Sequence, residues 1–400
     1  MTWLPIPDGS DFPLSNLPYG VGAAGPLVAI GDYVLGLAAL ADAGLLEGTG
    51  PDPKGDFHAS TLNPFMARGA RVWEAVRARL TELLSDAANE NAVSPALALR
   101  SQTQLVMPFA VGDYVDFYSS RAHAENLGRI FRPDAEALMP NWLHMPIGYH
   151  GRGGTVVVSG TAIRRPHGQR KAPSDVAPSF GPSARLDIEA EVGFVVGVGS
   201  ALGDSISTAD LAQHVFGVVL VNDWSARDLQ AWEYQPLGPF LGKSFATSIS
   251  PWVVPLAALD AARVPAHTGP DDPVILDYLK PAEQWGLDIS LEVEWNGTVV
   301  SRPPFAEMQW TMDQQLAHAT VNGASVRTGD LFASGTVSGS ATDQRGSFIE
   351  LSWNGRDLVR LDDGSSRSFL EDGDTIVIRA SAPAVGGGRL GFGEVKGVIA

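Results

Sequence analysis

Short β-branched segments separated by turn residues constrain this chain more than any other feature. They recur beyond residue 150, bounded by Gly, Pro, Asn or Asp, and read VVVSGTAIRR, LDIEAEVGFVVG, FGVVLVN, LDISLEVEWNGTVV, IELSWNG and GDTIVIRA. This pattern is typical of strands. Three other segments predict helices: SSRAHAENLGRIF, DWSARDLQAWEY and MQWTMDQQLAHATVN. Because strands and helices do not alternate regularly, the pattern argues against a doubly wound sheet. We expect an α+β fold that is mainly β.

The first hundred residues differ in character from the rest. PLVAIGDYVLGL predicts a hairpin that turns at Gly31-Asp32. Asn63-Pro64 predicts the start of a helix, whose buried stripe would be Phe65, Trp73, Val76, Leu80, Leu83 and Leu84. The stretch after it is polar and irregular. We therefore predict two domains, residues 1–105 and residues 106–400.

Charge and composition exclude several classes of function. The 400 residues carry 28 Lys and Arg against 45 Asp and Glu, a net charge of −17. This excess argues against nucleic acid and anionic membranes as partners, and an anionic small molecule would need local cations. The absence of cysteine excludes thiolate metal sites and thiol nucleophiles. No secretory leader or apolar membrane span is evident, so we expect a cytoplasmic location.

The segment LDIEAEVGFVV contains three carboxylates at alternating positions. In a strand, Asp187, Glu189 and Glu191 would share one face. They could form a solvated face, or they could bind a hard cation such as Mg²⁺ or Ca²⁺ through carboxylate oxygens.

A strongly apolar strand ends at Asn222-Asp223 and a helix follows it. Arg227, Gln230 and Tyr234 are spaced to share one face of that helix. The segment could be a binding surface next to Asp223, or an amphipathic helix that Asp223 caps. Lys243, one of five lysines, lies in the rigid loop beyond and is a candidate for binding an anion.

A third candidate segment is GDYVDFYSSRAHAENLGRIFR. Asp116 and Tyr118 precede a Ser119-Ser120 cap, and His123 falls in the first turns of the predicted helix. The positive end of a helix disfavours imidazolium, so His123 could act as a general base, although a histidine near a cap can also be structural.

These residues together resemble the fumarylacetoacetase family over nearly all of residues 106–400. The resemblance rests on DYVDFYSSRAHAENLG, PNWLHMPIGYHGR, LDIEAEVGFVVG, VNDWSARDLQAWEYQPLGPFLGKSFATSISPWVVP, GDLFASGTVSGS and LDDGSSRSFLEDGDTIVI. It implies hydrolysis of a carbon–carbon bond in 4-fumarylacetoacetate, a dicarboxylate β-diketone, to fumarate and acetoacetate. This is the last step of tyrosine and phenylalanine degradation. It also implies a homodimer whose protomer has an SH3-like β-barrel module followed by a mixed β-sandwich roll.

The resemblance further implies a site. The ligands of Mg²⁺ or Ca²⁺ would be Asp116, Glu189, Glu191 and Asp223, with secondary contacts from Lys243 and Thr247. His123 would be the base, paired with Glu350, and Arg227 and Lys243 would stabilise negative charge. The substrate would be held by Tyr118, Arg132, Tyr149, Gln230, Tyr234 and Thr336.

Two other functions stay open on the sequence. A related acylpyruvate hydrolase, or a diacid decarboxylase or isomerase, would share the acidic metal site but should lack the full set around His123 and Tyr234. A non-catalytic protein that binds a metal or a diacid would have no need of both His123 and Glu350.

Overall fold

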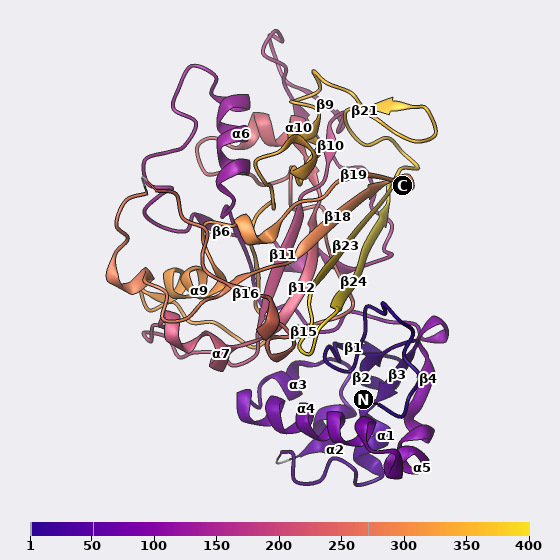
Figure 1. Cartoon of the computed structure of the whole chain (residues 1–400). Helices are drawn as coiled ribbons and strands as arrows, with labels where there is room; N and C mark the ends of the chain where they lie inside the picture. The colour runs from indigo at the N-terminus through magenta and orange to yellow at the C-terminus, as the bar shows by residue number, and fades with distance from the viewer. Residues whose placement is uncertain (1, 51, 271) are drawn as a thin grey trace.

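The computed structural model describes residues 2–50, 52–270 and 272–400 (Figure 1). Its N-terminal part contains a small antiparallel sheet of order β1-β2-β3-β4. These strands are β1 (Tyr19–Gly22), β2 (Gly25–Ile30), β3 (Tyr33–Gly36) and β4 (Leu97–Leu99). The predicted hairpin is confirmed, since Ile30 pairs with Tyr33 and Gly31 turns the chain at a φ of 54°.

Short helices surround this sheet. They are α1 (Leu37–Asp42), α2 (Pro53–Phe57), α3 (Asn63–Met66), α4 (Ala70–Ser85) and α5 (Glu90–Val93). The prediction of one helix from Asn63 onward was wrong, because Gly69, with a φ of 87°, separates α3 from α4. Asn63 does not act as the cap either, and its side-chain Nδ2 donates to the carbonyl of Ala110 at 3.0 Å. The predicted stripe is buried apart from the half-buried Trp73.

A large mixed sheet forms the centre of the rest of the chain. Its strands, in order, are β6 (Gly148–His150), β5 (Tyr114–Phe117), β20 (Leu331–Ala333), β11 (Ala190–Val196), β12 (Val215–Asp223), β14 (Thr247–Ile249) and β7 (Val156–Val158), and β15 (Val254–Pro255) also pairs with β12. β5 runs parallel to β20 and β14 runs parallel to β7, while the other neighbours are antiparallel.

A second antiparallel sheet covers one face of the large sheet (Figure 1). Its strands, in order, are β19 (Thr298–Ser301), β18 (Ser290–Trp295), β23 (Thr375–Pro383) and β24 (Arg389–Val398). Phe194 and Leu220 of the large sheet share a buried core with Trp295 and Ile378 of the second. The alternate residues of β11 and β12 join the N-terminal core instead. Burial on both faces explains why these strands are continuously apolar.

The remaining elements are short. Two-stranded ladders join β8 (His167–Arg170) to β9 (Ser179–Pro182), β10 (Leu186–Asp187) to β13 (Ser225–Ala226), β16 (Arg263–Val264) to β17 (Gly286–Leu287), and β21 (Val359–Arg360) to β22 (Ser366–Arg367). The helices are α6 (Arg121–Phe131), α7 (Leu211–His214), α8 (Arg227–Glu233), α9 (Met312–Thr320) and α10 (Phe348–Leu351). None of the helices in the described ranges has the length and apolar character that a membrane crossing requires.

Two local predictions were wrong, and both affect the site. IELSWNG is not a strand, because its first residues lie in α10 and Trp353 and Asn354 then adopt positive φ values of 47° and 60°. The helix after Asp223 begins only at Arg227, because β12 runs through Asp223 and β13 follows it. Asp223 is therefore the end of a strand and does not cap α8.

Candidate active site

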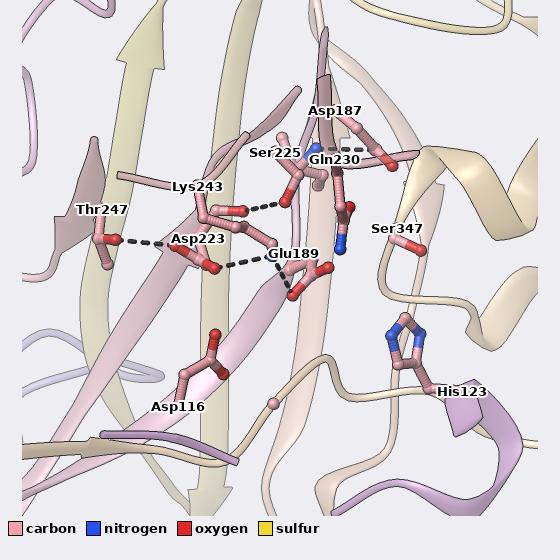
Figure 2. Close-up of polar contacts among 12 residues, drawn as sticks. Asp116, His123, Asp187, Glu189, Asp223, Ser225, Gln230, Lys243, Thr247 and Ser347 are labelled. Carbon is pink, nitrogen blue, oxygen red and sulfur yellow. Dashed lines mark hydrogen bonds and ion pairs between the residues drawn. The ribbon is translucent and has the colours of Figure 1, made fainter. Parts of the chain in front are cut away.

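Three buried carboxylates converge where β11 begins and β12 ends. Glu189, Glu191 and Asp223 each offer one oxygen, and these oxygens lie within 4.8 Å of one another. Glu189 lies between β10 and β11, and Ala190 pairs with Asn222, so the register brings the two strand ends together. Figure 2 shows Glu189 and Asp223 facing this common point. The alternative of a solvated strand face is wrong, because the side chains of Asp187, Glu189 and Glu191 are all buried.

Asp116 reaches the same region from β5. The hydroxyl of Tyr149 donates to its Oδ2 at 2.8 Å, and Nη2 of Arg152 donates to that oxygen at 3.3 Å and also to Asp223. Burial and the nearby Asp223 raise the pKa of Asp116 to about 6. The sequence analysis missed Arg152, whose guanidinium lies 4.8 Å from the ring centroid of Tyr114. The one feature of the sequence that could have indicated Arg152 is its position just after the aromatic residues of IGYHGR.

Two further cations and one hydroxyl hold this acidic group. Nζ of Lys243 lies 2.8 Å from both Glu189 and Asp223 (Figure 2). Thr247 donates to Asp223 at 2.8 Å, and Nη1 of Arg227 donates to Glu189 at 2.7 Å. Although burial opposes ionisation of Glu189, Lys243 and Arg227 hold its pKa well below the usual range.

Glu191 shows that these residues fit a divalent cation. Both of its carboxylate oxygens are buried and have no hydrogen-bond partner in the described chain. Burial, with Asp116 and Glu189 next in effect, raises its pKa well above the usual range. A buried carboxylate without a partner is costly, and oxygen-only donors suit Mg²⁺ or Ca²⁺. Glu189, Glu191 and Asp223 are thus able to hold such an ion.

A histidine–glutamate pair lies on another side of the site. The predicted cap is confirmed, because Oγ of Ser120 accepts the backbone N–H of His123 at 3.2 Å at the start of α6. Nδ1 of His123 lies 2.7 Å from Oε2 of Glu350, and both side chains are buried. Burial raises the pKa of Glu350, but His123 and hydrogen bonds lower this pKa by more than burial raises it, so the net shift is downward. The carboxylate therefore keeps its charge and orients the ring.

Three residues that the sequence analysis missed complete the surroundings of Glu350. Asn126 donates to Oε1 at 2.9 Å, and the hydroxyls of Ser338 and Ser347 donate to Oε2 at 3.0 and 2.7 Å. Asn126 lies one turn after His123 on α6, a spacing that could have signalled it. Ser347 lies three residues before Glu350, a spacing typical of a helix start that could have signalled it, whereas Ser338, 12 residues before Glu350, gave no signal.

A cavity of about 280 Å³ connects the acidic group to His123. Its lining includes Asp116, Glu189 and Lys243 together with all six residues expected to hold the substrate: Tyr118, Arg132, Tyr149, Gln230, Tyr234 and Thr336. The remaining expected residues are not part of this lining: Glu191, Asp223, Arg227, Thr247 and Glu350. A larger cavity, about 580 Å³, lies between the N-terminal residues and β24 and has none of these groups in its described lining.

Several polar groups of the cavity are free to bind a ligand. Nε of Arg132 and Oγ1 of Thr336 are buried and have no partner within residues 2–50, 52–270 and 272–400. Oε1 of Gln230 accepts from Arg227 at 3.0 Å, which leaves the amide nitrogen to donate.

A side chain at Gly128 would lie 1.9 Å from the carbonyl of Ala137, so glycine permits the close approach of the loop beyond Arg132.

Comparison with known proteins identifies the family of this chain. The family model "Fumarylacetoacetate (FAA) hydrolase C-terminal" matches residues 114–399, and "Fumarylacetoacetase N-terminal" matches residues 15–108. Fumarylacetoacetase of Homo sapiens is 45% identical over 417 residues, covering 100% of this chain and 98% of that protein. The chain belongs to the fumarylacetoacetase family.

Two further comparisons agree with this family in extent and fold. Fumarylacetoacetase of Arabidopsis thaliana is 43% identical over 418 residues, covering 100% of this chain and 98% of that protein. The solved structure of fumarylacetoacetate hydrolase from psychrophilic Exiguobacterium antarcticum has a TM-score of 0.54 at 14% identity, and covers 96% of this chain and 98% of that one. At that identity the structural match supports the fold alone: mainly β, with a small N-terminal sheet and a mixed sheet.

Proposed function

We infer that the chain hydrolyses the carbon–carbon bond of fumarylacetoacetate, giving fumarate and acetoacetate. One observation carries this inference. A buried His123–Glu350 pair and a buried group of carboxylates line or adjoin one cavity. Hydrolysis of a β-diketone requires both a base that activates water and a means of stabilising the carbanion that leaves. A binding protein without catalytic activity would not require the His123–Glu350 pair.

The first chemical step belongs to His123. Because Nδ1 is engaged with Glu350, Nε2 is the nitrogen that accepts a proton from water. The hydroxide formed attacks the ketone carbon of the fumaryl group, and the negative charge of Glu350 stabilises the imidazolium. Collapse of this adduct breaks the bond to the methylene carbon of the acetoacetyl fragment, so that the attacked carbon becomes a carboxyl group of fumarate. The imidazolium then returns the proton to the carbanion of the acetoacetyl fragment, so no proton is gained or lost on the enzyme.

Negative charge on the reacting oxygens meets two donors of the cavity lining. These are the ammonium of Lys243 and the amide nitrogen of Gln230. Arg227 is not part of the lining, so its part is to orient Gln230 and Glu189, and its direct contact with the substrate is not required. A bound divalent cation would supply Lewis acidity toward the charge of the leaving fragment.

The two carboxylates of the substrate require cations in a chain of net charge −17. Arg132 lies at the end of α6 with an unsatisfied Nε and is the candidate for one carboxylate. The phenols of Tyr118, Tyr149 and Tyr234 line the same cavity. The hydroxyls of Tyr118 and Tyr149 already donate to the carbonyl of Ala124 and to Asp116, so Tyr234 is the phenol that can donate to a remaining oxygen.

Finer properties belong to the same proposal. They are Mg²⁺ or Ca²⁺ as the bound ion, a homodimeric assembly and a cytoplasmic location. We also propose the division into residues 1–105 and 106–400, with an SH3-like barrel in the first and a β-sandwich roll in the second.

A substrate comparison tests the proposed function. The metal-loaded protein should consume fumarylacetoacetate, measured by absorbance, and release equimolar fumarate. Acylpyruvates of the same length should react much more slowly. A chelator should abolish the loss of substrate, and added Mg²⁺ or Ca²⁺ should restore it. Faster turnover of acylpyruvates would instead assign the chain to the related hydrolases.

A further inference from the structure

Asp187 is a buried carboxylate to which the mechanism above gives no part. Its side chain is fully buried at the end of β10. Oδ1 accepts the backbone N–H groups of Ile188 and Phe348, each at 2.7 Å. Oδ2 accepts the N–H of Ile349 at 3.0 Å and Nε of Arg227 at 2.7 Å. One carboxylate thus binds four donors from three separate segments of the chain.

Two of those donors open the helix that carries the partner of the base. Phe348 and Ile349 are the first residues of α10, and Glu350 follows directly. A four-residue helix is too short to be stable by itself, so its position depends on outside contacts. Asp187 takes two of the N–H groups that a helix start leaves without intrahelical partners. The place of Glu350, and with it the ring of His123, therefore depends on Asp187.

The fourth donor to Asp187 comes from the part of the site that contains the acidic group. Arg227, while held by Asp187 through Nε, donates through Nη1 to Glu189 and to Gln230. The backbone of Asp187 is itself fixed, because β10 pairs with β13 directly before α8. Figure 2 shows Asp187 on the side of Gln230 and Ser347, away from Asp223.

We propose that Asp187 is a positioning residue that fixes the base pair and the Arg227–Gln230 pair in one common frame. The proposal rests on the proposed function and adds a residue that touches neither the substrate nor the cavity. A carboxylate is required because all four partners donate. The amide of Asn would place a donor against at least one of those N–H groups and would remove the charge opposite Arg227.

The test compares Asp187→Asn with a matched control, Asp374→Asn. Asp374 is also buried and also accepts from a backbone N–H, from an amide and from an arginine, but it lies before β23 in the second sheet. We expect Asp187→Asn to lower kcat about 100-fold with a smaller change in KM, since misplacing a catalytic group by about 1 Å can cost that much. The control should lose stability but keep its kcat.

A spectroscopic readout separates positioning from stability. The proton between His123 and Glu350 should give a low-field NMR resonance, which Asp187→Asn should shift or abolish and Asp374→Asn should leave in place. Asp187→Glu keeps the charge but displaces the carboxylate, so it should show an intermediate kcat and a shifted resonance.

Each other outcome is decisive. A folded Asp187 variant with wild-type kcat and an unchanged resonance overturns the proposal. Failure of both Asp187 variants to fold, with the control folded, also overturns it in favour of a purely structural role. If the wild type shows the resonance but no turnover of fumarylacetoacetate, it is the proposed function that fails.

Discussion

We predict the effect of Asp116→Asn on the free energy of unfolding of the metal-free protein. The difference between this variant and the wild type should shift in favour of the variant as the pH rises from acidic to neutral. The pKa of Asp116 rises from its ordinary 3.8 to about 6 because of burial and Asp223. The unfolded chain therefore releases this proton near pH 3.8, and the folded chain releases it only near pH 6. Wild-type stability falls as pH rises through that window, and the asparagine variant lacks this loss.

The size of the effect follows from the shift. The difference, 6 − 3.8, is about 2 pKa units, which corresponds to about 3 kcal/mol as an upper value. Roughly two thirds of this lies between pH 4.5 and 7.5. The stability difference between variant and wild type should thus change by about 2 kcal/mol across that range, in favour of the variant at pH 7.5. Hydrogen bonds lost at both pH values cancel from this comparison.

Urea unfolding of chelator-treated protein at the two pH values measures the effect. Asp313→Asn is the matched control, because burial also raises the pKa of Asp313 to about 6 but its hydroxyl partner is Thr311, outside the acidic group. Added Mg²⁺ or Ca²⁺ should remove the advantage of Asp116→Asn and leave that of Asp313→Asn unchanged. Parallel pH dependences of wild type and Asp116→Asn would refute the reasoning.

Three other experiments probe separate parts of the site. Tyr234→Phe should weaken substrate binding by about 0.5–1.5 kcal/mol, which would be measured as a raised KM. Unchanged steady-state constants would show that the side chain of Tyr234 only packs against its neighbours. Glu189→Gln should lower both activity and bound metal, and an unchanged metal content by elemental analysis would remove Glu189 from the ligands. Glu350→Gln should reduce kcat less than His123→Ala, and the double variant should be little worse than His123→Ala alone. If the two effects on kcat multiply, the pair does not act as a unit.

The sequence predicts those parts of the site that depend on local order. The alternating positions of Glu189, just before β11, and Glu191, within it, bring the two carboxylates together, and the serine cap places His123 in the first turn of α6. Both follow from backbone geometry that a few neighbouring residues determine.

Contacts between distant segments could not be predicted in this way. IELSWNG, which includes part of α10, predicts a strand because it is a short segment bounded by turn residues, but Asp187, 161 positions from Phe348, accepts from the first N–H groups of a helix there. Arg152 was missed because its partner Asp223 lies 71 positions away. In both cases a buried carboxylate that is distant in the sequence decides the local structure.

The kcat of metal-loaded His123→Ala tests the central claim most directly. The account predicts a fall of roughly 10²–10⁴-fold in the hydrolysis of fumarylacetoacetate, with metal content and unfolding midpoint close to those of the wild type. A variant that keeps its metal and its fold and still turns over at the wild-type rate would contradict the assignment of His123 as the base.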